Sequence, residues 1–377
     1  MTAIAIGASL GVAACVSLSP SPGPAGVPVV RGQYKNGRDQ IVRIALATAE
    51  RGGPEGNPGL KGQFVVPRGN QFVEWKGKRY RGEIVVTATD SGFLVVNQVP
   101  MDDYLRGVVP LEIGNRTSAE MAAVQAQAVA ARTYAYKHLN EARPFDMYAT
   151  VQDQVYGGVD AEKPLADTAI ETTRDVVVLY NGQPITTPYH STCGGSTAGV
   201  SDVWYDQPDQ PYLRPVSDRI PGTNNYYCDP SPRFSWAQTY DAAGLRTVIE
   251  KYLASYTNAP KANLGRITDV REQGRTASGR VAALTVQTEG GSYTLRGNDI
   301  RFVLRDPKGA ILNSTLFTLS TAMSGGEVSD LTLNGRGYGH GIGMCQWGAI
   351  GRARAGQNYR TILETYYPGT TIGRIAG

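Results

Sequence analysis

The chain has 377 residues, of which 41% are hydrophobic and 19% are charged, and its formal net charge is +4. This length allows a large buried core and more than one folding unit, and the composition is that of an ordinary globular protein. Because lysine and arginine form no clustered run, the sequence does not predict a nucleic-acid partner. The small positive charge favours an anionic partner.

The first residues have the composition of an export signal. Residues 2–14 are apolar but too few to span a bilayer as a helix, and a Ser, Pro and Gly-rich tract follows at 17–28. The sequence VAAC ending at Cys15 resembles a bacterial lipobox, which predicts lipidation of Cys15. No basic residue precedes the apolar stretch; a wrongly assigned start codon would explain this, and secretion without a lipid is the alternative. We expect an exported protein of the cell envelope, anchored to a membrane through Cys15.

Short runs typical of β-strands come next. They lie at 41–46, 71–75, 82–87 and 92–96 and are separated by Gly, Asp, Asn and Pro, with a Gly/Pro-rich loop at 51–62. We expect this part to form a sheet scaffold without catalytic groups.

A helix with a clear start signal follows. Thr117 and Glu120 have the spacing of a capping box, which predicts a helix from about Ser118. Apolar residues then recur at steps of three and four and predict one apolar stripe. The stripe consists of Met121, Val124, Ala128, Ala131, Ala135 and Leu139, with Gln125, Gln127 and Arg132 off it.

Just before this helix, Glu112 lies between two apolar neighbours and two residues before Gly114. This setting suits a carboxyl at the edge of a cleft, where loss of solvent raises the pKa. The pattern predicts a candidate general acid. On spacing alone, a solvated surface glutamate is the more frequent explanation.

Further elements follow in the second half of the chain. We expect a helix at 161–173 with a proline in its first turn and a hairpin whose strand 175–180 is followed by an Asn-Gly type I′ turn. Its return strand leads to the segment YHSTCGG at 189–195. Later elements are a helix at 242–256, strands with glycine turns at 270–305 and a closing helix at 359–366.

Several motifs together resemble the SpoIID/LytB family, the stage II sporulation D and amidase-enhancer proteins of bacterial cell walls. They are YLRGVVPLE at 104–112, AQAVAARTYA at 126–135, DQVYGG at 153–158, HSTCGG at 190–195, GRGYGHGIGMCQWGA at 335–349 and YYPGT at 366–370. The family's usual Glu-Met-Pro reads Glu-Ile-Gly here, starting at Glu112. The Gly-rich motif has neither the context of a Rossmann fingerprint nor the Gly-Lys-Ser/Thr ending of a Walker loop, so no nucleotide cofactor is expected.

The elements and the resemblance together predict an α+β fold. We expect a mixed β-sheet scaffold with a central Ala-rich helix that carries the edge of the active site, plus an inserted β-rich subdomain. The predicted divisions are a signal segment at 1–14, lipid attachment and linker at 15–30, the core at 31–205 and 335–377, and the insertion at 206–334.

The resemblance also implies an activity. Family members with known activity are peptidoglycan lytic transglycosylases, which cleave the MurNAc-GlcNAc β-1,4 bond of peptide-denuded glycan strands and leave 1,6-anhydro-muramyl ends. It implies that Glu112 is the single general acid and base, because the C6 hydroxyl of the substrate replaces the second carboxylate of ordinary glycosidases. Asp102, Asp103 and Asp202 are weaker candidates.

The resemblance further implies a cleft that binds the sugars. Its expected residues are Gln127, Arg132, Tyr134, His190, Ser191, Thr192, Gly194, Gly195, His340, Gly341 and Gln346. For Arg132 and Tyr134, structural roles beneath the site are an equal alternative.

Two other classes of function stay open. One is a non-catalytic peptidoglycan-binding protein that enhances a partner N-acetylmuramoyl-L-alanine amidase. The other is a metal-dependent hydrolase that uses His190, His340 and the cysteines, although none of these lies in a tight ligand motif.

If Cys15 carries lipid, Cys193, Cys228 and Cys345 remain in an oxidising compartment, where disulfides persist. We expect a Cys193–Cys228 disulfide and a free Cys345, because many relatives carry Ser at the last position. The alternative is a structural zinc site that combines His190 with the three cysteines. No other cofactor is predicted.

Overall fold

The computed structural model describes residues 27–50, 62–66, 68 and 71–376. The predicted signal segment, the lipid-attachment residue Cys15 and nearly all of the Gly/Pro-rich loop at 51–62 lie outside these residues. Among the helices of the described part, none is both long enough and apolar enough to cross a membrane.

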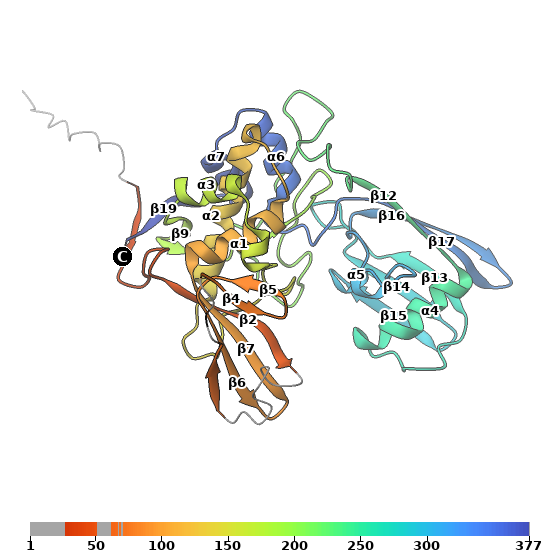
Figure 1. Ribbon diagram of the computed structural model, residues 1–377. Helices are drawn as coiled ribbons and strands as arrows, with labels where there is room; N and C mark the ends of the chain where they lie inside the picture. The colour runs from red at the N-terminus through yellow and green to blue at the C-terminus, as the bar shows by residue number, and fades with distance from the viewer. Residues whose placement is uncertain (1–26, 51–61, 67, 69–70, 377) are drawn as a thin grey trace, which may run out of the picture.

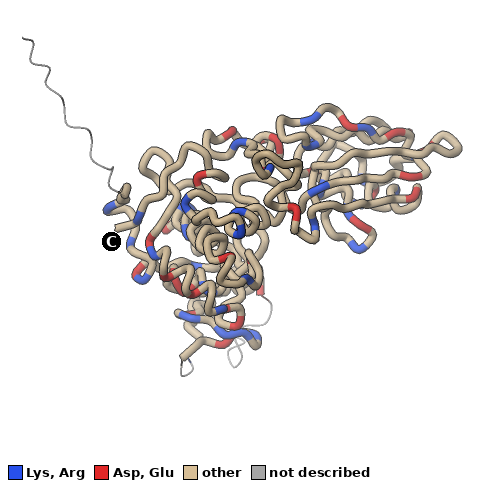
Figure 2. The backbone as a smooth tube through the Cα atoms, turned by 90° about the horizontal axis from the view of Figure 1, so that it is seen from above, with Lys and Arg blue, Asp and Glu red and all other residues tan. Residues whose placement is uncertain are grey.

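The fold is α+β, as predicted, and Figure 1 shows two units side by side. The larger unit holds the main hydrophobic cluster, to which residues from Val30 to Ile375 contribute. The smaller unit has a hydrophobic cluster of its own, formed by residues between Tyr240 and Leu333. Basic and acidic residues are interspersed along both units (Figure 2).

The first sheet of the larger unit has the strand order β3-β6-β7-β2-β8. Its strands are β2 (Ile41–Glu50), β3 (Gln63–Val65), β6 (Glu83–Thr89), β7 (Gly92–Pro100) and β8 (Met147–Tyr148), and a separate hairpin pairs β4 (Val73–Trp75) with β5 (Lys78–Tyr80). The predicted strands of this region are therefore present, and the sheet supports the helices that follow.

Helix α2 (Met121–His138) is the centre of the larger unit. A short 3-10 turn (Ser118–Glu120) precedes it, and the Glu120 carboxylate accepts a hydrogen bond from the Thr117 amide at 3.0 Å. The helix contacts strand β9 (Val176–Tyr180) and four other helices. These are α1 (Met101–Ile113), α3 (Pro164–Thr172), α6 (Gln346–Arg354) and α7 (Tyr359–Tyr366).

The prediction of a single apolar stripe on α2 was wrong. The helix is buried on nearly all sides, and the side chains of Gln127 and Arg132 are both completely buried. Neighbouring helices surround it, so small alanine side chains are needed to let them approach.

A second sheet has the order β1-β19-β9-β10, so strands β1 (Val29–Arg31) and β19 (Thr371–Ala376) from opposite ends of the chain are neighbours. The hairpin from β9 to β10 (Gln183–Pro184) turns through Asn181 and Gly182, both with positive φ, as the predicted type I′ turn requires. Strand β11 (Tyr189–His190) then pairs in parallel with β18 (Met344–Cys345). This pairing brings the HSTCGG and Gly-rich motifs together.

The smaller unit consists of two three-stranded sheets and short helices. The first sheet contains β12 (Ser235–Asp241), β17 (Glu327–Arg336) and β16 (Phe317–Ser324), and the second contains β13 (Ile267–Glu272), β14 (Ala283–Thr288) and β15 (Gly291–Arg296), with helices α4 (Ala242–Tyr252) and α5 (Asp299–Val303). The first strand of this unit begins at Ser235, whereas the predicted insertion begins at 206. Tyr212, Leu213 and Cys228 belong to the main cluster, so the segment 206–234 packs on the larger unit.

Candidate active site

Glu112 lies in the last turn of α1, which ends where Gly114 takes a left-handed conformation with φ of +75°. Its side chain is half-buried. The backbone amide of Val155, in the DQVYGG segment, donates a hydrogen bond to Oε1 of Glu112 at 2.9 Å. The end of a helix and a distant loop together therefore fix this carboxyl.

The surroundings of Glu112 favour its neutral form. Burial raises the pKa of Glu112 above its ordinary value, against the opposing effects of the Val155 amide and the side chains of Gln346 and Tyr189, which lower it. All three opposing groups are neutral. A carboxyl with a raised pKa in a neutral polar setting suits general acid catalysis.

Neutral polar side chains from several elements gather around this carboxyl. Gln346 at the start of α6 donates to Oε1 of Gln127 on α2 at 3.2 Å. The Gln127 Nε2 atom and the Tyr189 hydroxyl are buried without a hydrogen-bond partner among the described residues. Buried polar atoms are normally paired, so these two donors are free to bind a ligand or water.

Three contributors to this site were not singled out in the sequence. They are Tyr189, Val155 and Gln154, which accepts a hydrogen bond from the Tyr104 hydroxyl at 2.9 Å and donates to the Ala131 carbonyl at 3.2 Å. All three lie inside or next to the quoted motifs, and this position was the only feature of the sequence that could have indicated them.

The two histidines of the motifs are neutral and face each other, with ring centroids 5.5 Å apart. In His340, Nδ1 accepts from the Ile342 amide at 3.1 Å, so Nε2 carries the proton and donates to the Tyr189 carbonyl at 2.9 Å. His190 Nδ1 lies 3.1 Å from the Ile342 carbonyl, and its Nε2 has no partner among the described residues. Burial lowers the pKa of both, that of His340 to about 4.

Tyr189, the neighbour of His190, is the side chain that acts on Glu112. Because successive side chains on a strand point to opposite faces, His190 points away from Glu112, and its role in the cleft stays a prediction. Since both ring nitrogens of His340 are occupied, the arrangement also gives no support to a metal-dependent hydrolase.

Arg132 and Tyr134, expected as substrate ligands or structural residues, have structural contacts. Arg132 is completely buried and donates to the carbonyls of Thr173 at 2.8 Å and Ile170 at 3.2 Å, which lie at the C-terminal end of α3. The Tyr134 hydroxyl donates to Asp153 at 2.8 Å. Neither side chain is among the groups that shift the pKa of Glu112. The buried Arg132 cannot reach a substrate, whereas for the half-buried Tyr134 the role of substrate ligand stays a prediction.

Thr192 and Gly341 make structural contacts, and their role as ligands stays a prediction. The Thr192 hydroxyl is buried and lies 2.7 Å from that of Ser231. A Cβ atom on Gly341 would come within 2.6 Å of the Arg280 guanidinium, so this position requires glycine. Ser191 remains half-buried, with its hydroxyl 3.3 Å from that of Thr192.

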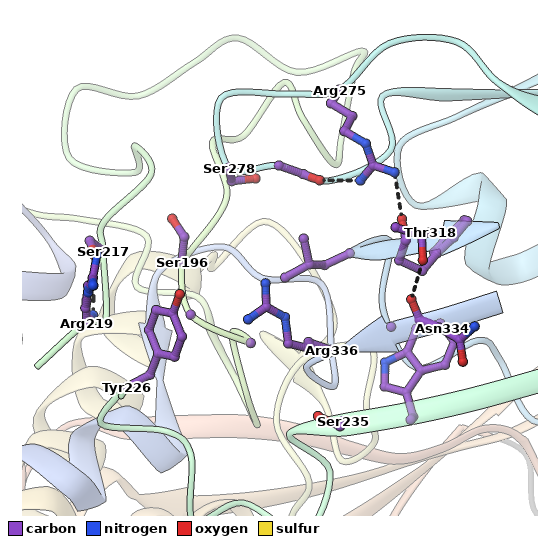
Figure 3. Close-up of a pocket in the computed structure, with 17 residues that line it drawn as sticks. Ser196, Ser217, Arg219, Tyr226, Ser235, Arg275, Ser278, Thr318, Asn334 and Arg336 are labelled. Atoms are coloured by element: carbon purple, nitrogen blue, oxygen red, sulfur yellow. Dashed lines mark hydrogen bonds between the residues drawn. The ribbon is translucent and has the colours of Figure 1, made fainter. Parts of the chain in front are cut away.

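Gly194 and Gly195 line a pocket of about 740 Å³ between the two units (Figure 3). Three arginines (Arg219, Arg275 and Arg336) and three aromatic residues (Tyr226, Trp236 and Phe317) also line it, and no acidic residue does. Glu112 is not part of this lining. The predicted ligand residues thus divide between a carboxyl site in the larger unit and a basic, aromatic pocket at the junction.

The other candidate carboxylates are engaged elsewhere. Asp102 pairs with Arg174 at 3.3 Å, and Asp103 lies 3.6 Å from Arg106. Asp202 accepts from the Gly199 amide at 3.2 Å. None of them is among the groups that shift the pKa of Glu112.

Cys193, Cys228 and Cys345 are buried free thiols. The expected Cys193–Cys228 disulfide is not formed, but the two sulfurs lie only 3.5 Å apart, so the pairing stays a prediction. The thiols gather around the Asp218 carboxylate rather than His190.

Comparisons with known proteins agree with the motifs. A family model described as stage II sporulation protein (SpoIID) matches residues 89–180, and a domain of unknown function (DUF8618) matches residues 220–343. An uncharacterized protein of Brachyspira hyodysenteriae is 32% identical over 299 residues, which cover 78% of this chain and 73% of that protein.

Two similar proteins, both from Bacillus subtilis, have names that describe a function. The amidase enhancer is 32% identical over 290 residues, 71% of this chain but only 40% of that protein. Stage II sporulation protein D is 27% identical over 294 residues, 74% of this chain and 75% of that protein. The chain is thus similar to proteins named for amidase enhancement and for sporulation. The chain belongs to the SpoIID family.

Proposed function

We propose that this protein is a peptidoglycan lytic transglycosylase that cleaves the MurNAc-GlcNAc β-1,4 bond of peptide-denuded glycan strands. The names of its relatives support a role related to the cell wall. The observation that carries the specific reaction is the setting of Glu112, a half-buried carboxyl with a raised pKa and only neutral groups acting on it.

In this proposal Glu112 acts twice. Its carboxyl first donates a proton to the glycosidic oxygen while the bond from that oxygen to C1 breaks. The resulting carboxylate then removes the proton from the C6 hydroxyl of the same sugar, whose oxygen forms the new bond to C1. The products are a 1,6-anhydro end and a free hydroxyl on the leaving sugar, and Glu112 is protonated again.

Among the described residues, no acidic group contributes to the shifted pKa of Glu112, which favours a transglycosylase over an ordinary glycosidase. A hydrolytic pair needs its two carboxyl groups roughly 5–10 Å apart, whereas the groups that shift the pKa of Glu112 include no acid. The unpaired donors of Gln127 and Tyr189 would bind sugar hydroxyl and N-acetyl oxygens next to the cleaved bond.

The pocket at the junction fits another stretch of the same strand. Removal of the stem peptide leaves a lactyl carboxylate on each MurNAc, and guanidinium groups bind carboxylates well. Of the three arginines in the lining, Arg275 already pairs with Glu272, so Arg219 and Arg336 are the two offered to lactyl carboxylates. They lie beside three aromatic rings on which sugar faces can pack. We therefore assign the preference for denuded strands to this pocket.

Product analysis tests the proposal. Purified chain is incubated with peptide-free glycan strands, and the products are identified by mass spectrometry. We expect anhydro-muramyl products from the wild type and from Glu364→Gln, which alters an exposed glutamate, and none from Glu112→Gln. Full cleavage by Glu112→Gln would show that another group is the acid.

Amidase enhancement is the second candidate function, because the relative of that name matches 71% of this chain. It predicts no anhydro product from the wild type. On peptidoglycan that keeps its stem peptides, it predicts that an N-acetylmuramoyl-L-alanine amidase releases them faster with this chain than without it. The same two assays therefore separate the candidates.

A further inference from the structure

Four buried side chains from three segments meet next to the active site. Cys193 follows β11, Asp218 and Cys228 lie in the segment 206–234, and Cys345 ends β18. Their sulfur and carboxylate oxygen atoms all lie within 4.8 Å of one another. All four side chains have no exposed surface.

We propose that Cys193, Asp218, Cys228 and Cys345 bind one zinc ion as a tetrahedral structural site. The distance from Cys193 Sγ is 3.5 Å to Cys228 Sγ and 3.6 Å to Oδ2 of Asp218. A zinc–sulfur bond of about 2.3 Å places two tetrahedral sulfur ligands roughly 3.8 Å apart, whereas a disulfide needs about 2.05 Å. The donors are thus already close to ligand positions.

Backbone amides are arranged as they are around metal-bound thiolates. The Cys193 amide donates to Cys345 Sγ at 3.1 Å, and the Gly348 amide donates to the same sulfur at 3.2 Å. The Gly195 amide donates to Cys193 Sγ at 3.4 Å. Such outer contacts orient the ligands and stabilise their negative charge.

The carboxylate ligand is held in the same manner. Oδ1 of Asp218 accepts from the Tyr366 hydroxyl at 2.6 Å and pairs with Arg352 at 3.3 Å. The other oxygen, Oδ2, faces the sulfurs. A Cβ atom on Gly348 would come within 2.6 Å of Oδ2, so glycine leaves room for the cluster.

When the three thiols are ionised, as zinc ligands are, a divalent cation balances the charges around the cluster. Three thiolates and one carboxylate carry four negative charges, and zinc reduces these to two. Two buried guanidinium groups offset the remainder: Arg352, and Arg280, whose Nη2 donates to the Cys193 carbonyl at 3.0 Å. Within the described residues, Arg280 forms no ion pair, and its Nε and Nη1 have no hydrogen-bond partner.

The site would join three parts of the molecule. It links the HSTCGG segment, the segment that leads to the inserted subdomain and the start of α6, where Gln346 directly follows Cys345. Zinc would thus hold Gln346 in its place beside Glu112. The inference rests on the cluster alone and does not depend on the proposed reaction.

Metal analysis of the purified full-length chain, grown with zinc and without added chelator, tests the proposal. We expect about one zinc per chain by elemental mass spectrometry, in the wild type and in the matched control Cys15→Ser. Cys228→Ser and the isosteric Asp218→Asn should both lose zinc. Cobalt substitution should give a thiolate-to-metal absorption band in the wild type that Cys345→Ser weakens.

Intact-mass measurement without reductant can reveal the result that would overturn the zinc proposal. The proposal predicts that Cys193 and Cys228 are thiolate ligands in the zinc-loaded protein, so that the chain denatured for this measurement has the mass of the reduced form, with no disulfide. A metal-free protein whose Cys193 and Cys228 are joined by a disulfide would overturn it. Full zinc content in Cys228→Ser and Asp218→Asn would equally overturn the ligand set.

Discussion

At Glu112, burial has consequences for stability that are separate from catalysis. Burial raises the pKa of Glu112 in the folded state, so the folded chain binds this proton more tightly than the unfolded chain. The stability from this group is fully present below the unfolded pKa of about 4.3 and is lost as the pH rises through the folded pKa. The ionised carboxylate is therefore destabilising near neutral pH.

Glu112→Gln should consequently raise the unfolding temperature near pH 7, and the gain should shrink as the pH falls towards about 4. The glutamine oxygen can still accept the hydrogen bond from the Val155 amide. Thermal unfolding of both proteins at the two pH values checks this. A variant less stable than the wild type at neutral pH would contradict the burial of the carboxylate.

Gln346 should control the pH range of activity. Its side chain lowers the pKa of Glu112, so Gln346→Leu should raise that pKa further. Because the proposed acid must be protonated, activity falls above its pKa, and the alkaline limb of kcat/KM should move to higher pH in the variant. If kcat/KM instead falls equally at every pH, Gln346 only shapes the site.

The sequence indicated the candidate acid but not its setting. The motif resemblance singled out Glu112, Gln127 and Gln346, which the structure brings together. Val155 and Tyr189 act on the same carboxyl from positions more than forty residues away, and no spacing rule connects such distant positions. Asp218 could not be predicted for the same reason, because only the fold brings its carboxylate next to the cysteines.

Among the elements, α2 depends on small side chains. Ala128 is completely buried on this central helix, so Ala128→Leu should lower the free energy of unfolding by about 1–3 kcal/mol through overpacking. Denaturant unfolding measures the loss. The control Ala243→Leu, at an exposed position on α4, should change stability by less than about 0.5 kcal/mol.

Arg132 ties α2 to the end of α3. Arg132→Leu would leave the carbonyls of Thr173 and Ile170 and the Asp102 carboxylate without this donor, and we expect a loss of about 2–4 kcal/mol in stability. The folded variant should keep its KM, because the side chain is away from the substrate. A raised KM with normal stability would restore Arg132 as a ligand.

Elements with local signals were predicted, and elements defined by burial were missed. The capping box marked the start of α2, and Asn181-Gly182 marked the hairpin. Helix α1 was missed because it contains Gly107, Pro110 and β-branched valines, which are poor helix formers. Tertiary packing overrides that preference: Tyr104, Leu105, Val108 and Val109 form a fully buried face.

For the whole molecule, the insertion creates a surface that neither unit has alone. The two units have separate hydrophobic clusters, and the basic pocket lies where Gly194 and Gly195 meet strands β12, β16 and β17. Composition indicated only a weak preference for an anionic partner. The fold places three arginines that are far apart in the sequence, Arg219, Arg275 and Arg336, on the lining of this one pocket (Figure 3).

Arg336 is the best probe of this pocket. Its guanidinium lies over the ring of Tyr226 at 5.8 Å and pairs with no carboxylate among the described residues. If it binds a lactyl carboxylate, Arg336→Gln should raise the KM for denuded strands about two- to five-fold, the size of an exposed ion pair, without changing kcat. The control Arg374→Gln alters an exposed arginine of β19 outside the pocket.

Strands whose lactyl carboxylates have been converted to amides complete this experiment. The wild type should bind them as weakly as Arg336→Gln binds unmodified strands, and the variant should not distinguish the two substrates. The wild-type preference should also decline as salt is added, because exposed charges are screened. Equal KM values for wild type and variant on denuded strands would remove the pocket from substrate binding and leave Glu112 and its neighbours as the whole site.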